Sequence, residues 1–265
     1  MPACKPLKLR GRLLGAETSP LVCVPLLGRS VEGLLAELVS LRAAGPDLAG
    51  PDLIEWRADY LETAADVAQW LSIAQQLHAA AEGVPLIFTW RSAAEGGEPV
   101  TIDAADLRQI NVAMAASGLF SLIDIESAAD ASHREPIMQA ARRSGTAVIV
   151  SRHDFSGTPP LETLLEWFAL AEQLGADVAK VAVMPQADED VLALLAASAQ
   201  ATRRLRIPLI SMAMGARGAL SRIFGHQLGS TVTFAAGVAP SAPGQWSLPA
   251  LRAVLSTLAD QHAPR

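Results

Sequence analysis

Lysine is scarce in this sequence, although basic residues are not. It occurs only at Lys5, Lys8 and Lys180, whereas the other 18 of the 21 basic residues are arginine. Lys180 lies in the apolar run 177–185, which is typical of a short strand closed by a proline. Arginine keeps its proton at neutral pH and forms no imine, whereas a desolvated lysine can lose its proton and act as a nucleophile. Lys180 is therefore the first candidate for a reactive residue.

Other absences narrow the class of protein. The two cysteines, Cys4 and Cys23, form no pattern and predict free thiols in a reducing compartment. No apolar run approaches the roughly 18 residues that span a bilayer, and the basic N-terminus lacks the apolar segment of a secretory signal. The net charge of −6 provides no basic field for nucleic acid or membrane. We expect a cytoplasmic protein that acts on a small molecule.

From Pro20 onward, β-rich apolar runs alternate with Ala/Leu-rich helical stretches about every thirty residues. The runs begin near Leu21, Asp52, Val84, Leu119, Thr146, Asp177, Ile207 and Ser230. The helical stretches cover about 30–44, 63–81, 103–117, 130–143, 160–174, 188–204, 215–227 and 247–260. Eight such units predict an α/β fold, the (β/α)8 TIM barrel, whose usual length is about 250 residues.

An open, doubly wound sheet is the structural alternative. It is disfavoured because no Gly-x-Gly-x-x-Gly turn follows the first run, where the sequence reads VPLLGR over 24–29. Residues 7–18 are expected to form a short β-hairpin that turns near Gly11 or Gly15. No linker or low-complexity run interrupts the pattern, so we expect one catalytic barrel domain over 1–265, with 1–19 as an N-terminal extension.

Polar residues gather where the predicted strands end, which is where barrel enzymes place their active sites. From the second run to the eighth they are Glu55, Arg57, Arg91, Asp124, Glu126, His153, Lys180, Arg222, Ser241 and Gln245. Buried charges are costly unless paired, and one shared site accounts for all of them together. Arginines beside Lys180 are expected to lower the pKa of its amine and so favour nucleophilic attack.

Each of these residues also has a structural interpretation. Lys180 could pair with a carboxylate such as Glu126, and His153 could be an ordinary hydrogen-bonded loop histidine. Glu55 and Arg57 could form a structural ion pair.

Arg91 and Arg222 could cap helices, and a divalent cation could sit among Glu55, Asp124 and Glu126. The neighbouring arginines favour an anionic organic ligand over a metal. The five histidines lack ligand spacing: His78, His133, His153, His226 and His262.

Six motifs in register resemble the type I 3-dehydroquinate dehydratase family, from about Val22 to the last predicted helix. They are EWRAD at 55–59, TWRS at 89–92 with EGGE at 95–98, SRHDF at 151–155, AKVAVMP at 179–185, SR at 221–222 and SAPGQ at 241–245. The resemblance implies a hydro-lyase of the shikimate pathway that is a homodimeric (β/α)8 barrel and needs no metal or other cofactor.

The resemblance also implies residue roles. Lys180 would form an imine with the ketone of 3-dehydroquinate, and His153 would serve as general base and then general acid. Glu95 would orient His153. The substrate's ring hydroxyls and its carboxylate would be held by two groups: Glu55, Arg57 and Arg91 for the hydroxyls, and Arg222, Ser241 and Gln245 for the carboxylate. Dehydration would release 3-dehydroshikimate, whether in aromatic biosynthesis or in quinate breakdown.

One position departs from the family pattern. The family commonly carries a serine in the first strand where this sequence has Pro25, which offers neither a hydroxyl nor an N–H group. We expect a modestly raised KM and intact imine chemistry. Two other functions stay open, a different Schiff-base lyase such as a class I aldolase and a catalytically silent ligand-binding barrel.

Overall fold

The computed structural model describes residues 4–15, 19–42, 50–63, 66–99 and 102–262. The chain begins with an antiparallel hairpin of β1 (Leu7–Leu9) and β2 (Arg12–Leu14). Its turn lies at Arg10 and Gly11, which both have positive φ, 42° and 90°. Glycine adopts this left-handed conformation without a steric cost. The predicted hairpin is thus confirmed with its turn at Gly11, and residues 16–18 lie outside the described residues.

Eight parallel strands form the second sheet, in the order β10-β3-β4-β5-β6-β7-β8-β9. They are β3 (Leu21–Leu26), β4 (Leu53–Arg57), β5 (Leu86–Thr89), β6 (Leu122–Glu126), β7 (Ala147–Asp154), β8 (Val178–Val183), β9 (Leu209–Ala213) and β10 (Val232–Phe234). A parallel bridge joins Leu209 to Ser230, and the Thr231 N–H donates to the Leu209 carbonyl at 2.9 Å. These contacts bring the two edges together, so the predicted barrel is confirmed and the open-sheet alternative is wrong.

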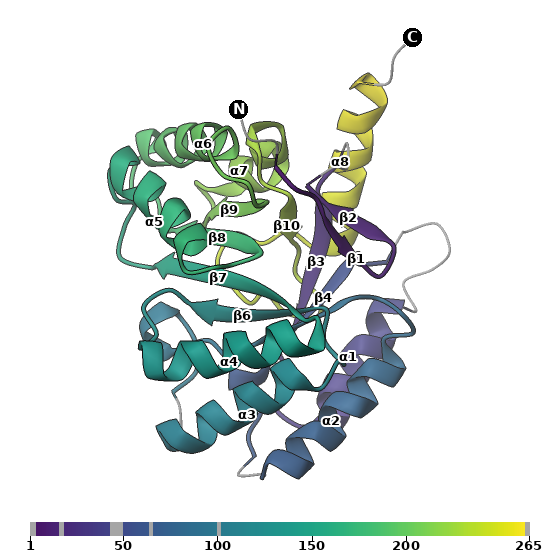
Figure 1. Cartoon of the computed structure of the whole chain (residues 1–265). Coiled ribbons are helices and arrows are strands. Elements are labelled where there is room, and N and C mark those ends of the chain that lie inside the picture. The colour runs from purple at the N-terminus through teal and green to yellow at the C-terminus, as the bar shows by residue number, and fades with distance from the viewer. Residues whose placement is uncertain (1–3, 16–18, 43–49, 64–65, 100–101, 263–265) are drawn as a thin grey trace.

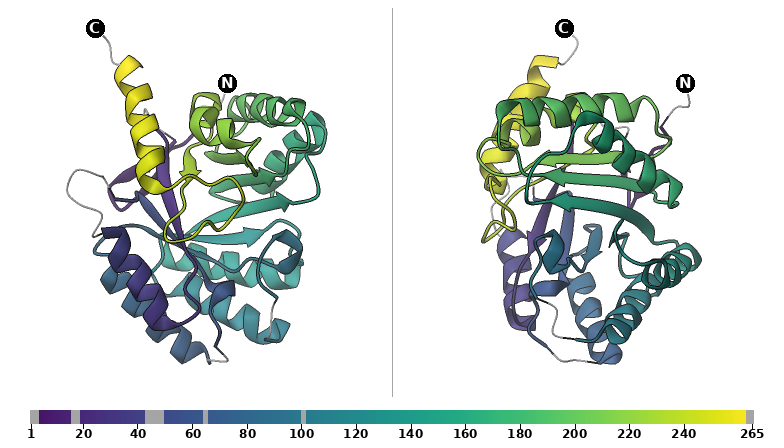
Figure 2. Two further views of the ribbon diagram at one scale, coloured as in Figure 1. Left: turned by 180° about the vertical axis from the view of Figure 1, so that it is seen from behind. Right: turned by 90° about the vertical axis from the view of Figure 1, so that its left-hand side faces the viewer.

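Helices follow the strands and surround them on the outside (Figures 1 and 2). They are α1 (Val31–Arg42), α2 (Val67–Ala80), α3 (Ala104–Ala116), α4 (Ala131–Ser144), α5 (Leu161–Gln173), α6 (Asp188–Thr202), α7 (Ala219–Phe224) and α8 (Leu248–His262). No described helix has the length and apolar character needed to cross a membrane.

The helix predicted over 215–227 is the element that differs most from the structure. α7 covers only Ala219–Phe224 and is followed by a 3-10 turn, η3 (Gly225–Leu228). Gly215 has φ 72°, and the backbone of Gly218 packs so closely on the Ala213 carbonyl that a Cβ would lie 2.2 Å from its oxygen. The two glycines turn the chain sharply after β9, which delays the start of the helix.

The core has two layers, one inside the barrel and one between the barrel and its helices. On β8, Val178 and Ala182 belong to the inner layer, whereas Ala179 and Val181 pack in the outer layer. Leu9 and Leu14 of the hairpin also pack in the inner layer, at 3% and 1% exposure. Side chains alternate along a strand, so Lys180 lies on the inner face with Val178 and Ala182, as the sequence predicts.

Candidate active site

Lys180 occupies the centre of the barrel and is 4% exposed. Its Nζ donates to Asp124 Oδ2 at 2.8 Å and to Glu55 Oε1 at 3.4 Å. It also lies 4.9 Å from the centre of the Phe234 ring. Glu126, the partner suggested by the sequence, is bound by Arg91 instead.

The expectation that arginines lower the pKa of Lys180 is wrong in its net direction. Burial is the largest influence and lowers the pKa, and Arg91 acts in the same sense. Asp124 and Glu55 outweigh both and raise the pKa above its usual value. The resting amine is therefore an ammonium that must lose a proton before it can attack a carbonyl.

Arg91 is a buried hub that follows β5. Its guanidinium donates to Asp124 Oδ1 at 2.7 Å, to Glu126 Oε1 at 3.1 Å and to Ser151 Oγ at 2.9 Å. Burial alone would raise the pKa of Asp124, but Arg91 and Lys180 hold it well below its usual range. Asp124 is therefore a permanent anion between two cations, and the helix-cap interpretation of Arg91 does not hold.

Two further residues from β4 reach the same space. Glu55 Oε1 accepts a hydrogen bond from Thr89 Oγ1 at 2.9 Å. Arg57 makes a bidentate pair with Asp59, at 2.8 and 2.7 Å, in place of the alternative structural pair of Glu55 with Arg57. The Asp59 carboxylate also accepts backbone N–H groups of Arg91 and Glu98 at 3.3 and 3.1 Å. Asp59 therefore ties the loop after β5 to the end of β4.

His153 and Glu95 form a hydrogen-bonded pair across β7 and η2 (Ala93–Glu95). Glu95 Oε2 lies 2.9 Å from both the backbone nitrogen and the Nδ1 of His153. This arrangement occupies Nδ1 and leaves Nε2 as the ring's free acceptor. Burial, followed by Arg91 and Lys180, lowers the pKa of His153 well below its usual range, so the imidazole is neutral at pH 7.

Arg222 lies near the mouth without a carboxylate partner among the described residues. It is 2% exposed, its Nη2 donates to the Pro243 carbonyl at 3.1 Å, and its Nε is buried without a hydrogen-bond partner. Burial lowers the pKa of Arg222 to about 10. Ser241 and Gln245 bind one another nearby, with Gln245 Nε2 donating to Ser241 Oγ at 2.9 Å. This buried guanidinium has unused capacity for an anion.

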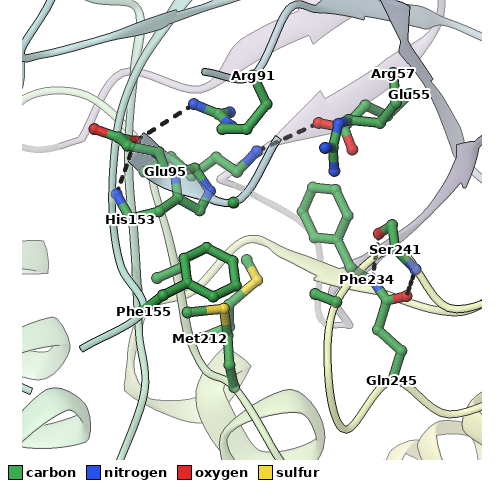
Figure 3. Close-up of a pocket in the computed structure, with 15 residues that line it drawn as sticks. Glu55, Arg57, Arg91, Glu95, His153, Phe155, Met212, Phe234, Ser241 and Gln245 are labelled. Atoms are coloured by element: carbon green, nitrogen blue, oxygen red, sulfur yellow. Dashed lines mark hydrogen bonds and ion pairs between the residues drawn. The ribbon is translucent and has the colours of Figure 1, made fainter. Parts of the chain in front are cut away.

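Eight of the nine predicted site residues line a single pocket, which Figure 3 shows in close-up. Its lining consists of Glu55, Arg57, Arg91, Glu95, Gly96, His153, Phe155, Lys180, Ala182, Met212, Met214, Phe234, Ser241, Ala242 and Gln245. The ninth, Arg222, lies behind this wall, with Nη1 3.9 Å from the Met212 sulfur. Within the described chain, no group of three or more His, Cys, Asp or Glu side chains is arranged to hold a metal ion.

Sequence reasoning missed several contributors to the site. Thr89, Ser151 and Asp59 orient Glu55, Asp124 and Arg57 through the hydrogen bonds given above. All three lie inside the motifs quoted above. Their position next to charged residues at the strand ends was the feature of the sequence that could have identified them.

Phe234 was also missed, and an aromatic residue that ends the eighth strand would have been the signal for it. Pro25 is buried opposite Glu55 in the register of β3 and β4 and does not line the pocket.

A closed parallel barrel with a buried lysine, a paired histidine and an unpartnered arginine at the carboxyl ends of its strands defines a (β/α)8-barrel enzyme. The family model for type I 3-dehydroquinase matches residues 22–262. The chain belongs to the type I 3-dehydroquinase family.

Individual relatives agree with the family match over nearly full length. The chain is 41% identical to the 3-dehydroquinate dehydratase of Aromatoleum aromaticum, with 97% of both chains covered. A crystal structure of the Geobacillus kaustophilus 3-dehydroquinate dehydratase superposes with a TM-score of 0.90 at 40% identity, with 99% of both chains covered.

A second similar structure is that of the type I 3-dehydroquinate dehydratase of Clostridium difficile with covalently modified comenic acid. It has a TM-score of 0.90 at 33% identity and covers 97% of this chain and 99% of that one. A 3-hexulose-6-phosphate synthase, at 18% identity and a TM-score of 0.56, shares the barrel fold alone.

Proposed function

We propose that this protein is a 3-dehydroquinate dehydratase that removes water from 3-dehydroquinate through an imine on Lys180, to give 3-dehydroshikimate. The observation that carries the proposal is the placement of one buried amine and one neutral imidazole in a single pocket, with the Arg222 guanidinium behind its wall and without a carboxylate partner among the described residues. Family membership supports the substrate, because the relatives described above carry the name of this activity.

The first stage is imine formation. The Lys180 ammonium gives a proton to neutral His153, and the freed Nζ attacks the substrate ketone. His153 returns that proton to the hydroxyl of the resulting carbinolamine, which leaves as water. His153 is then neutral again, and a protonated imine remains with Asp124 and Glu55 as nearby anions. That cation withdraws electrons from the neighbouring carbon and makes its C–H more acidic.

The second stage is elimination. His153 Nε2 removes the proton from the acidified carbon, and the electron pair of that C–H bond moves toward the imine nitrogen. The pair then returns to expel the hydroxyl group, to which His153 gives back its proton as water leaves. Hydrolysis of the remaining imine consumes one water and frees Lys180 and the product. The reaction thus loses one water overall.

Substrate orientation is assigned to the polar rim. Arg222, whose Nε has no partner, would bind the carboxylate together with Ser241 and Gln245. Glu55 and Arg57 would bind ring hydroxyls from the other side of the pocket. Arg91, whose donors are already used by Asp124, Glu126 and Ser151, would act on the substrate mainly through its charge.

Borohydride trapping tests the imine directly. The protein is treated with 3-dehydroquinate and sodium borohydride, digested and analysed by mass spectrometry. We expect a reduced adduct on Lys180 and none on Lys5 or Lys8, the exposed lysines that act as internal controls. Lys180→Arg keeps the charge and should lose both the adduct and turnover, by about 10⁴-fold or more in kcat. Dehydration without an adduct would rule out this mechanism.

An adduct without dehydration would instead favour a different Schiff-base lyase. The single domain over 1–265, the homodimer, the absence of a cofactor and the cytoplasmic location stay predictions. Light scattering on the purified protein tests the dimer.

A further inference from the structure

Arg152 lies beside His153 on β7 but on the opposite face of the strand. Ser151 and His153 point into the barrel, where Ser151 Oγ donates to Asp124 Oδ1 at 2.6 Å. The Arg152 side chain is 38% exposed, and its guanidinium lies 5.4 Å from the centre of the Trp167 ring on α5. At this distance a guanidinium is attracted to the face of an indole, so Trp167 limits where Arg152 can go.

The Glu95 carboxylate lies between these two neighbours on β7. Its Oε2 is engaged by the backbone nitrogen and Nδ1 of His153, each at 2.9 Å. Its Oε1 is buried without a hydrogen-bond partner, and Arg152 Nη1 lies 3.8 Å from it. A buried carboxylate oxygen without a donor carries a desolvation penalty that a nearby positive charge offsets.

The other charges around Glu95 come from two strands. Arg91, after β5, places Nη1 3.5 Å from Glu95 Oε2. Glu126 and Asp124, from β6, oppose ionisation. Burial, followed by Glu126, raises the pKa of Glu95 to about 7, and Arg91 acts in the opposite sense.

Glu95 is thus poised between its charged and neutral forms at neutral pH, where a small added field has its greatest effect on the population of each form. The other carboxylate that Arg152 influences is Asp154, which already accepts hydrogen bonds from Ser156 and Gly157.

We propose that Arg152, steadied by Trp167, is a positioning residue that keeps the Glu95 carboxylate ionised and aligned on Nδ1 of His153. The inference rests on the proposed function, because it assigns Arg152 to the acid–base pair of that reaction. An ionised Glu95 accepts the Nδ1 proton and so keeps Nε2 free to take a proton from the substrate. Loss of Arg152 would let Glu95 bind a proton at higher pH and leave His153 poorly oriented.

The dependence of kcat on pH tests the predicted direction of the change in the pKa of Glu95. Removing a cation raises the pKa of Glu95, and it also raises that of His153. Both changes move the acid limb of the profile to higher pH. For Arg152→Gln we expect the acid limb to move upward by about half a pH unit to one unit. The displacement is smaller than a fully buried charge would cause, because Arg152 is partly exposed.

Matched variants separate charge from structure. Arg152→Lys should restore the acid limb, and Trp167→Leu should reproduce part of the displacement with the arginine still present. Arg143→Gln removes an exposed arginine at the end of α4 and should leave the profile unchanged.

In a Glu95→Gln background, Arg152→Gln should displace the acid limb much less, because only the direct effect of the lost charge on His153 remains. An unchanged acid limb in Arg152→Gln, or an equal displacement with and without Glu95, would overturn the proposal.

An NMR titration keeps this test independent of turnover. The ring nitrogens of His153 are followed in ¹⁵N-histidine-labelled, ligand-free protein from pH 5 to 9. We expect the titration midpoint in Arg152→Gln to lie above that of the wild-type protein, and the midpoint in Arg152→Lys to match it. Coincident midpoints in all three proteins would overturn the proposal. If the wild-type protein had no dehydratase activity, the proposed function would be contradicted, whereas the NMR titration would still test the role of Arg152.

Discussion

The two ends of the barrel carry buried charges that are partnered in different ways. At the amino-terminal end, Asp52 accepts the Val22 N–H at 2.8 Å and pairs with Arg12 and Arg252, each at 2.7 Å. These contacts tie the hairpin, β3 and α8 to the start of β4. At the carboxyl end, Arg222 is buried with no carboxylate partner among the described residues.

The difference separates stability from function. Charges at the amino-terminal end are paired with opposite charges by the fold itself, so they contribute to the folded state. At the carboxyl end, Arg222 lacks such a partner among the described residues, which costs stability and is recovered only when a complementary anion binds. The same residue type, arginine, serves both purposes in Arg252 and Arg222.

Of the substitutions that test the contrast between the two ends of the barrel, one at His153 should have the largest effect on activity. His153→Ala removes the proposed acid–base group and should lower kcat by roughly 10³- to 10⁴-fold. The thermal midpoint of unfolding should change little, because His153 takes part in none of the ion pairs at the amino-terminal end of the barrel. Steady-state kinetics and borohydride trapping check it, and the variant should still form some Lys180 adduct. A loss of less than tenfold would contradict the assigned role.

Arg222 and Arg252 form a matched pair of substitutions. Arg222→Met should lower kcat/KM by about 10- to 100-fold through loss of charged hydrogen bonds to the carboxylate. It should also stabilise the protein by about 1 kcal/mol, since an unpaired buried charge is removed. Arg252→Met should do the reverse, with lower stability and unchanged KM. Denaturant unfolding and kinetics on both variants check the contrast, which fails if both proteins lose stability equally.

Asp52→Ala should affect stability alone. It removes the acceptor of the Val22 N–H and leaves two arginines without their partner, so the free energy of unfolding should fall by roughly 2 kcal/mol. The kcat of the folded protein should stay within about twofold of wild type, because Asp52 lies at the end away from the pocket. Urea unfolding measures the free energy of unfolding, and kinetics at low temperature measure kcat. A large loss of kcat in fully folded protein would show that the two ends are coupled.

Pro25→Ser should have the smallest effect. A serine hydroxyl facing the barrel could bind a substrate hydroxyl, which is worth about 0.5–1.5 kcal/mol, or up to about a tenfold lower KM. The change is measured as kcat/KM with 3-dehydroquinate, with Pro25→Ala as the control that lacks the hydroxyl. No gain of serine over alanine would mean that this position makes no substrate contact.

The barrel and the polar residues at its strand ends could be predicted because their signals are local. Alternating apolar runs and helices predicted the eight units, and two-residue spacing placed Lys180 on the inner face. The helix over 215–227 was overestimated because Gly215 and Gly218 are tolerated in a helical pattern, while their actual conformation is set by packing against β9 and the loop at Pro243.

Pairing inside the barrel could not be predicted in the same way. The ladder aligns Glu126 with Ser151, and Ser151 with Lys180, which makes Glu126 the expected partner. Barrel strands are tilted, so residues in one ladder row do not lie at one height along the axis. Lys180 therefore meets Asp124, two residues earlier on β6, and Glu126 is left to Arg91.

By itself, the sequence determined which side chains exist, which face of each strand they occupy and that one lysine lies among them, because these depend on neighbours along the chain. Only the tertiary structure decided which charges meet. That choice set the pKa of Lys180 above its usual value, because Asp124 and Glu55, at 2.8 and 3.4 Å from its amine, outweigh burial and Arg91. It also left Arg222 without a carboxylate partner in the described part of the chain and set Glu95 between His153 and Arg152, since electrostatic interactions depend on distance in space and on burial.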